Sequence, residues 1–273
     1  MKIYFVDAFT NEKFKGNPAA VCYLEKQISN TLKQQIAKEI GFSETAFIQP
    51  LNVEENKYSL QWFTPVTEIN LCGHATLSSA KILFTYYLNH QSPILFESKS
   101  GILKASLDGD AILLDFPVEY AVKSKKDYLN LGKLIGIETE FECYECPQTA
   151  NLMFVVQDES ELRSLRPDYE RLIQLDISPF SSVCVTAPGL QPFDFVSRCF
   201  APWEGINEDP VTGSTHTFLT PYWSEIFQKT SMKARQLSER SGELELDLSG
   251  ERVFIKGQAQ VMLKGEFFHE EYK

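Results

Sequence analysis

Two short segments of the sequence place a glycine directly before small and polar residues, where an extended segment should change into a helix. One is GHAT at 73–76, and the other, 140 residues later, is GSTH at 213–216. Glycine lets the backbone approach a ligand closely, and the first N–H groups of a helix lack partners within the helix. With the helix dipole, these donors favour a carboxylate or a phosphate. The segments therefore predict two helix starts that bind a small acid. The alternative is two ordinary caps, in which Thr76 or Ser214 satisfies the donors.

Glu44 is the candidate for proton transfer. It lies in GFSETAF, between the predicted end of a helix at Gly41 and a predicted strand, among small and apolar residues. A carboxylate in a partly dry cleft has a raised proton affinity and suits general acid/base catalysis. The alternative is an ordinary surface glutamate, which is the usual state of this residue type. Ser182 occupies the corresponding place in the second half of the sequence, so only one half carries the ionisable group, as a directional proton transfer requires.

Asp209 and His74 are further candidates for catalysis. Asp209 precedes Pro210 and lies four residues before Gly213, so the segment that delivers the second helix start also delivers this carboxylate. Its alternative is a plain Asp-Pro turn. Glu44 and Asp209, one from each half, could divide the acid and base roles on one substrate. His74, in the first turn of the first helix, could donate a hydrogen bond to a substrate carboxylate or carry a proton.

The cysteines give weak support for a metal site or a thiol nucleophile. Cys143 and Cys146 form a single CxxC pair, without the second pair typical of a zinc site. Cys72 and His74 are two positions apart, and residues at this spacing on a helix do not face each other, so we do not expect them to act together. The segment GNPAA at 16–20 lacks the P-loop lysine, and no GxGxxG motif follows a strand. We therefore expect neither a metal nor a cofactor.

The elements that must position these residues occur twice along the chain. Two strands at the start precede a helix with Ser29 as its cap and Gly41 as its stop, and a long helix after Gly73 should be buried centrally. A similar order returns after residue 140, at offsets of 134 to 140 residues, with a helix at 159–173 in place of the first one. Strand-rich halves with a helix in the middle of each predict the α+β class.

Length, charge and composition restrict the kind of protein further. The 273 residues fit two domains, which we place at 1–118 and 119–256, with the polar segment VKSKKD near the boundary. A net charge of −11 argues against nucleic acid or an anionic membrane as a partner. The sequence has no apolar run long enough to span a membrane and no signal peptide, so we expect a cytoplasmic protein with six free thiols.

Four segments, in this order, resemble the PhzF-like proteins, which are named after an isomerase of phenazine biosynthesis and have the diaminopimelate-epimerase-like fold. They are FTNEKFKGNPAAV, GFSETAF, FTPVTEINLCGHAT and FAPWEGINEDPVTGSTH, and they extend over nearly the whole chain. The resemblance implies two similar domains, each a curved, mostly antiparallel sheet around a central helix, with the active site between them. It also implies that the C-terminal strand, at about 257–273, completes the first domain, and that the protein forms a homodimer.

The resemblance also implies roles for single residues. Glu44 matches the essential acid/base glutamate of the family, and His74, Asp209 and Ser214 match its cleft histidine, aspartate and serine. Asn70 departs from the pattern, because many relatives have an acidic residue there, and we interpret the change as a variation in substrate contacts. The substrate-binding residues that we assign are Gly73, Gly213, Ser214 and Asn17.

Diaminopimelate epimerases and proline racemases share this fold but use two cysteines, one at each helix start. This sequence keeps Cys72 but has Thr212-Gly213-Ser214 at the second start. We therefore expect a cofactor-independent isomerase that shifts a proton on a small, carboxylate-bearing, amino-acid-like substrate, with Glu44 as general acid/base. The alternatives left open are a one-cysteine or carboxylate-based amino-acid racemase, and a small-molecule-binding or interaction protein without turnover. The identity of the substrate, and the roles of Cys72 and of Cys143 and Cys146, also stay open.

Overall fold

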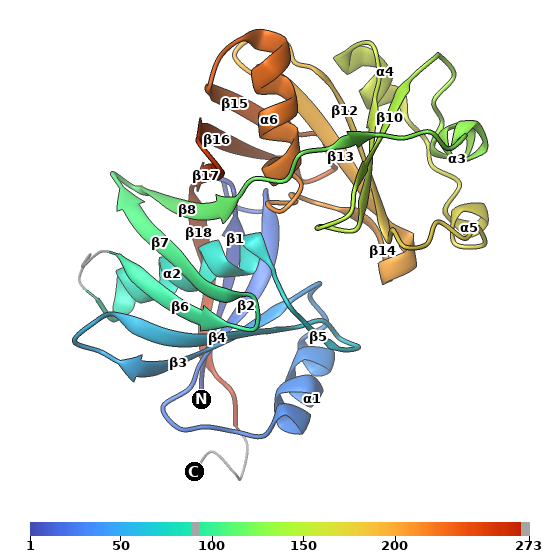
Figure 1. The fold of residues 1–273 in the computed structure, drawn as a ribbon. Coiled ribbons are helices and arrows are strands. Elements are labelled where there is room, and N and C mark those ends of the chain that lie inside the picture. The colour runs from blue at the N-terminus through green and yellow to red at the C-terminus, as the bar shows by residue number, and fades with distance from the viewer. Residues whose placement is uncertain (89–92, 269–273) are drawn as a thin grey trace. The chain divides into compact units, whose positions relative to one another are not determined.

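The structure is a computed structural model that describes residues 1–88 and 93–268 (Figure 1). The chain divides into two compact units. Unit 1 comprises Met1–Phe116 and Phe254–Lys273, and unit 2 comprises Pro117–Val253. Each unit combines a strongly curved, mostly antiparallel sheet with a central helix, which confirms the predicted α+β class.

Unit 1 is built around its long helix α2. Its elements are β1 (Lys2–Ala8), β2 (Asn17–Tyr23), α1 (Asn30–Ile40), β3 (Thr45–Asn52), β4 (Lys57–Phe63), β5 (Glu68–Ile69), α2 (Gly73–Tyr86), β6 (Ile94–Ser98), β7 (Gly101–Asp108), β8 (Ala111–Pro117) and β18 (Ala259–Glu266).

Unit 2 is built in the same way around α6. Its elements are β9 (Val122–Lys123), α3 (Leu129–Ile135), β10 (Glu142–Cys146), β11 (Asn151–Val155), α4 (Glu159–Ser164), α5 (Tyr169–Leu172), β12 (Ser182–Pro188), β13 (Phe195–Ala201), the 3₁₀ helix η1 (Pro202–Glu204), β14 (Ile206–Asp209), α6 (His216–Phe227), β15 (Ser231–Gln236) and β16 (Gly242–Ser249). Strand β17 (Arg252–Gly257) carries the chain back to unit 1.

The two units repeat one order of strand pairing. In unit 1, β2 pairs with β3 in parallel, β3 with β4 antiparallel, and β4 with β6 in parallel. In unit 2, β11 pairs with β12 in parallel, β12 with β13 antiparallel, and β13 with β15 in parallel. Parallel neighbours need a crossover connection, which α1 and α2 supply in unit 1, as α4 with α5 and then α6 do in unit 2. This repeat confirms the duplicated architecture that the sequence predicts.

Helix α1 forms where its local signals predict. The Ser29 hydroxyl accepts a hydrogen bond from the N–H of Leu32 at 3.1 Å, and such a cap stabilises a helix by about 1 kcal/mol. At the other end Gly41 adopts a left-handed conformation, with φ of 73°, and donates its N–H to the carbonyl of Ala37. Leu32 and Ile36 are buried in a hydrophobic cluster that also holds Phe47 of β3. This docking fixes the segment in which Glu44 lies.

Helix α2 is buried on nearly every side, as predicted. All its residues from Gly73 to Phe84 are buried except Lys81. Strands β1, β2, β3 and β18 pack against it. Strand β18 pairs antiparallel with β1, from Ala259 opposite Ala8 to Glu266 opposite Lys2, so the C-terminal segment belongs to the sheet around α2.

Two helix predictions in unit 2 are wrong in detail. Residues 159–173 form the two short helices α4 and α5 instead of one, because Pro167 has no N–H to donate and disfavours helical geometry at the residue before it. Helix α6 begins at His216 instead of Gly213. The preceding turn is tighter than an α-helix, with the N–H of His216 donating to the carbonyl of Gly213 and the N–H of Thr217 to that of Ser214, both at 3.1 Å.

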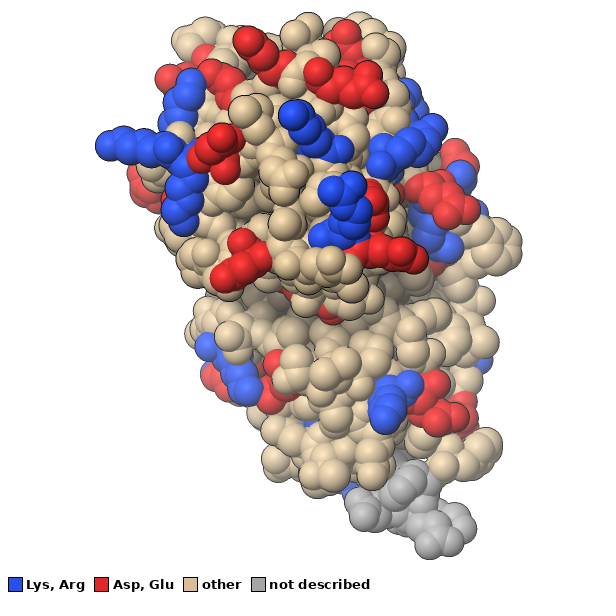
Figure 2. Space-filling view, turned by 90° about the vertical axis from the view of Figure 1, so that its right-hand side faces the viewer, with Lys and Arg blue, Asp and Glu red and all other residues tan. Residues whose placement is uncertain are grey.

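The surface carries charges of both signs. Figure 2 shows one face on which Lys and Arg side chains are interspersed with Asp and Glu. Exposed ion pairs such as Lys123–Glu142 and Lys233–Glu245 belong to this mixed surface charge. The six cysteines are free thiols, as expected. Within residues 1–88 and 93–268, none of the helices has the length and apolar composition needed to cross a membrane.

Candidate active site

Unit 1 brings Glu44 and His74 into contact. Glu44 lies between α1 and β3, and its carbonyl accepts a hydrogen bond from the N–H of Ala20 in β2 at 3.3 Å. His74 is the second residue of α2. Its Nε2 atom lies 3.0 Å from Oε2 of Glu44, and the two side chains are only 5% and 12% exposed. Two sequence candidates that are 30 positions apart therefore form one nearly buried acid–base pair.

The pKa values of this pair move in opposite directions. Burial alone would raise the pKa of Glu44, but the charge and hydrogen bond of His74, with a hydrogen bond from Ser43, lower it overall. Burial also disfavours the charged form of His74, but the neighbouring Cys72 sulfur and Glu44 carboxylate raise the pKa of His74 well above its usual value. At neutral pH, Glu44 is therefore ionised and His74 is protonated. The predicted rise in the proton affinity of Glu44 is wrong, because the adjacent imidazolium outweighs desolvation.

The other ring nitrogen of His74 contacts Asn17 and Cys72. Nδ2 of Asn17 lies 3.2 Å from Nδ1 of His74, and Sγ of Cys72 lies 3.5 Å from the same atom. The prediction that Cys72 and His74 do not meet is wrong, because Cys72 precedes the helix in an extended conformation, with φ of −146° and ψ of 113°. Burial raises the pKa of the Cys72 thiol despite the nearby His74.

Neither of the two predicted ligand-binding helices has a side-chain cap at its start. At α2 the N-cap is Cys72, which makes no capping hydrogen bond, and the hydroxyl of Thr76 donates to the Cys72 carbonyl. At α6 the N-cap is Thr215, which also makes no capping hydrogen bond. The alternative of an ordinary cap by Thr76 is therefore wrong, whereas the cap by Ser214 stays a prediction. The N-cap side chains therefore leave the first N–H groups of both helices able to bind an anion.

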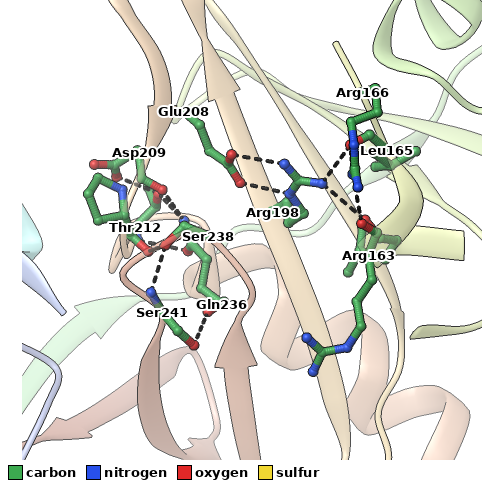
Figure 3. Close-up of polar contacts among 12 residues, drawn as sticks. Arg163, Leu165, Arg166, Arg198, Glu208, Asp209, Thr212, Gln236, Ser238 and Ser241 are labelled. Atoms are coloured by element: carbon green, nitrogen blue, oxygen red, sulfur yellow. Dashed lines mark hydrogen bonds and ion pairs between the residues drawn. The ribbon is translucent and has the colours of Figure 1, made fainter. Parts of the chain in front are cut away.

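In unit 2, the end of β14 and the turn that leads to α6 carry Asp209, Gly213 and Ser214. The hydroxyl of Thr212 donates to Oδ2 of Asp209 (Figure 3). The fully buried Gln236 holds both ends of this turn, because its Nε2 donates to the Asp209 carbonyl at 2.7 Å and its Oε1 accepts the Thr212 N–H at 2.8 Å. A side chain from β15 thus holds the backbone at Asp209, and the Thr212 hydroxyl contacts its carboxylate.

A nearly buried ion pair fixes the residue before Asp209. Nε and Nη2 of Arg198 donate to Oε1 and Oε2 of Glu208 at 2.7 and 2.9 Å. Nη1 of Arg198 also donates to the carbonyls of Leu162 and Leu165, at 3.2 and 3.1 Å. Figure 3 shows this guanidinium between the Glu208 carboxylate and the Leu165 carbonyl. The two-point pairing ties β14 to β13 directly beside Asp209.

The structure gathers the predicted residues into two sets. Unit 1 holds Glu44 with Gly73, His74 and Asn17, and unit 2 holds the turn with Asp209. Sequence reasoning missed two of the residues that support the second set. Thr212 had a usable signal, since it is a hydroxyl residue three positions after Asp209, whereas Gln236 had none, since it lies 27 positions away in a strand without a motif.

Comparisons with known proteins agree over nearly the full length. The "Phenazine biosynthesis-like protein" family, PhzC-PhzF, matches residues 6–265. The chain is 44% identical over 267 residues to an "Uncharacterized isomerase" of Halalkalibacterium halodurans, covering 97% of both proteins. It is 42% identical over 284 residues to "Phenazine biosynthesis-like domain-containing protein 2" of Mus musculus, covering 97% of this chain and 98% of that protein. A PhzF family crystal structure from Enterococcus faecalis has a TM-score of 0.90 at 40% identity, covering 98% of this chain and 99% of that chain. The chain belongs to the PhzC-PhzF family of phenazine biosynthesis-like proteins.

Proposed function

We propose that this protein is a cofactor-independent isomerase that shifts a proton on a small, carboxylate-bearing, amino-acid-like substrate. The observation that carries the proposal is the 3.0 Å contact between an ionised Glu44 and a protonated His74 at the start of α2. The relative from Halalkalibacterium halodurans, which bears the name of an isomerase at 44% identity, supports the reaction class.

Glu44 acts as the base and then as the acid. Its carboxylate removes a proton from a carbon that an adjacent carboxylate or double bond acidifies, and becomes a neutral carboxylic acid. It then returns this proton to another carbon of the same molecule, so the protein ends the cycle unchanged. The imidazolium of His74 stabilises the negative charge that develops on the substrate in between.

The start of α2 binds the substrate carboxylate. The first N–H groups of this helix, from Gly73 on, point along the helix axis and carry its positive end. Asn17 lies 3.2 Å from Nδ1 of His74 and, with its amide oxygen turned to accept the Nδ1 proton of the imidazolium, orients the ring toward Glu44 and the substrate. Binding of the carboxylate and stabilisation of the transition state thus use one small part of unit 1.

Unit 2 contributes the remaining residues in this proposal. The resemblance of NEDPVTGSTH to the family pattern assigns Asp209 as the acid partner, and Gly213 and Ser214 as substrate-binding residues. The proposal is supported by the contacts of Thr212 and Gln236, which restrict the turn that carries the Asp209 carboxylate. A group that must meet a substrate in one geometry benefits from such support.

The substitution Glu44→Gln tests the proposal, because it keeps the shape of the side chain and removes its proton affinity. The protein is incubated in D2O with a panel of small amino acids and unsaturated carboxylates, and deuterium uptake is read by mass spectrometry. For a compound that the wild type deuterates, the exchange rate should be about 10² to 10⁴ times lower in Glu44→Gln, which is the usual contribution of a general base. Glu54→Gln, an exposed residue of unit 1, is the matched control and should exchange normally. Exchange that persists in Glu44→Gln refutes the assignment.

A second candidate function is racemisation with Cys72 as the base. The 3.5 Å contact between its sulfur and His74 favours it, whereas the raised pKa of the buried thiol argues against it. Racemisation predicts that Cys72→Ser abolishes proton exchange and that thiol reagents inactivate the protein. Exchange that survives this substitution excludes the racemase.

A further inference from the structure

Three side chains of different chemistry converge in unit 1. They are the carboxylate of Glu44, the thiol of Cys72 and the imidazole of His74, and one ligand atom from each lies within 4.8 Å of the other two. Nε2 of His74 lies 3.0 Å from Oε2 of Glu44 and 3.9 Å from Sγ of Cys72. Oxygen, nitrogen and sulfur donors thus lie together in one small cluster.

Two of these separations are close to those between the ligands of a tetrahedral zinc ion. Zinc binds nitrogen and oxygen at about 2.0–2.2 Å and thiolate sulfur at about 2.3 Å, so tetrahedral ligands would lie about 3.3 Å apart for nitrogen and oxygen and about 3.6 Å apart for sulfur and nitrogen. The observed 3.0 and 3.9 Å each differ from these values by a few tenths of an ångström. Sγ of Cys72 lies closer to Nδ1 of His74, at 3.5 Å, so the Cys72 side chain must rotate toward Nε2 before the three ligands share one ion.

The identity of the donors selects the class of metal. An imidazole with a thiolate suits zinc and metals of similar softness, whereas magnesium and calcium prefer oxygen ligands alone. Three protein ligands leave a fourth position for water. The cluster is nearly buried, since Cys72 is 6% exposed, His74 4% and the side chain of Glu44 12%.

Asn17 supplies the outer contact that a metal-binding histidine needs. If Nε2 of His74 binds the metal, Nδ1 carries the proton, and the Asn17 side chain lies 3.2 Å away to accept it after its amide turns. Outer contacts of this kind fix the ring and are worth about 10-fold to 100-fold in metal affinity. The cluster therefore has three ligands, an outer contact and an open position.

We propose that Glu44, Cys72 and His74 form a binding site for a zinc-class divalent cation, whose binding releases the Nε2 proton of His74 and the thiol proton of Cys72 to solvent. The bound ion takes the Glu44 carboxylate and the His74 nitrogen out of proton transfer, so the site is inhibitory, a consequence that rests on the proposed function. This site differs from the CxxC pair, which is the pair of cysteines in the sequence that most resembles a zinc motif.

Metal titration of the full chain tests the site without any substrate. The protein is stripped with a chelator, and zinc is titrated by calorimetry and cobalt by absorption, since a thiolate bound to cobalt gives a charge-transfer band. The wild type should bind one ion per chain and show this band, and Cys72→Ser should lose the band. Asn17→Ala should bind the ion about 10-fold to 100-fold more weakly than the wild type. Circular dichroism checks that each variant is folded.

Cys143→Ser is the matched control, because it removes a thiol of the CxxC pair in unit 2 and should leave the band unchanged. A folded wild type that binds no zinc, or a cobalt band that survives Cys72→Ser or disappears in Cys143→Ser, overturns the proposal. The readout is distinct from that of the isomerase, because zinc binding without any deuterium exchange contradicts the proposed function alone.

Discussion

Breaking the Arg198–Glu208 pair should destabilise unit 2 strongly. Glu208→Gln removes the negative charge but leaves the guanidinium 11% exposed beside a neutral amide. Loss of one partner from a buried ion pair costs about 3–5 kcal/mol, and the lower end applies here because two carbonyls still accept from Arg198. Arg198→Met should cost about 5 kcal/mol, since it leaves the Glu208 carboxylate and both carbonyls without this donor.

Urea denaturation followed by tryptophan fluorescence measures these changes. Two of the three tryptophans, Trp203 and Trp223, lie in unit 2, so the signal reports chiefly on that unit. The matched control is Glu245→Gln, whose partner Lys233 lies 3.9 Å away with both side chains at least half exposed. Exposed pairs contribute little, so this variant should unfold at nearly the same urea concentration as the wild type.

The double variant Arg198→Met/Glu208→Leu decides between two explanations. If an uncompensated buried charge causes the loss, removal of both charges should cost at least about 2 kcal/mol less than the sum of Arg198→Met and Glu208→Leu measured singly. Additive losses would show that the side chains contribute independently through packing. If Glu208→Gln lowers the free energy of unfolding by less than about 1 kcal/mol, the reasoning is also refuted, because exposed ion pairs contribute that little.

Two further predictions concern the two sets of site residues. Folding raises the pKa of His74 above 6.5 and lowers that of Glu44 below 4.5, so the ion pair should stabilise the protein fully between these two values. This stabilisation should be lost as the pH rises through the folded-state pKa of His74, and also as the pH falls through the folded-state pKa of Glu44. The melting temperature of His74→Asn should therefore depend less on pH than that of the wild type in both of these pH ranges. Gln236→Leu leaves the Asp209 carbonyl and the Thr212 N–H without their partner and should destabilise unit 2 by about 2 kcal/mol. Hydrogen exchange should speed up at 209–215 in this variant and stay normal in the exposed control Gln174→Leu, and equal exchange in both would contradict the role of Gln236.

Local signals predicted the parts of the fold that depend on a few neighbouring residues. Ser29 caps the start of α1 and Gly41 terminates it, as expected, because a capping side chain and a left-handed glycine each act within one turn of the helix. The prediction of one helix at 159–173 is wrong because it follows the internal repeat, which places a single helix at this point. Pro167 in the same segment indicates a break in the helix, and the structure has two short helices on either side of it. Where local chemistry and an internal repeat disagree, the local chemistry prevails here.

The candidate site was predictable residue by residue but not in its contacts. Glu44 and His74 were identified from their surroundings, yet the direction of the Glu44 pKa depends on a distance of 3.0 Å that no spacing encodes. Cys72 was expected to avoid His74 because a helical rule was applied one residue outside the helix. Gln236 reaches Asp209 from another strand, and such a contact follows only from the folded sheet.

The return of the chain to unit 1 also sets an order of assembly on the ribosome. Glu44 and His74 are synthesised early, but β1 keeps an open edge until β18, which pairs with it from Ala259 to Glu266, has been made. Unit 2 is continuous from Pro117 to Val253 and is therefore complete before that strand emerges. The nascent chain can finish its second unit first, and the helix that presents His74 obtains its full sheet only near the end of translation.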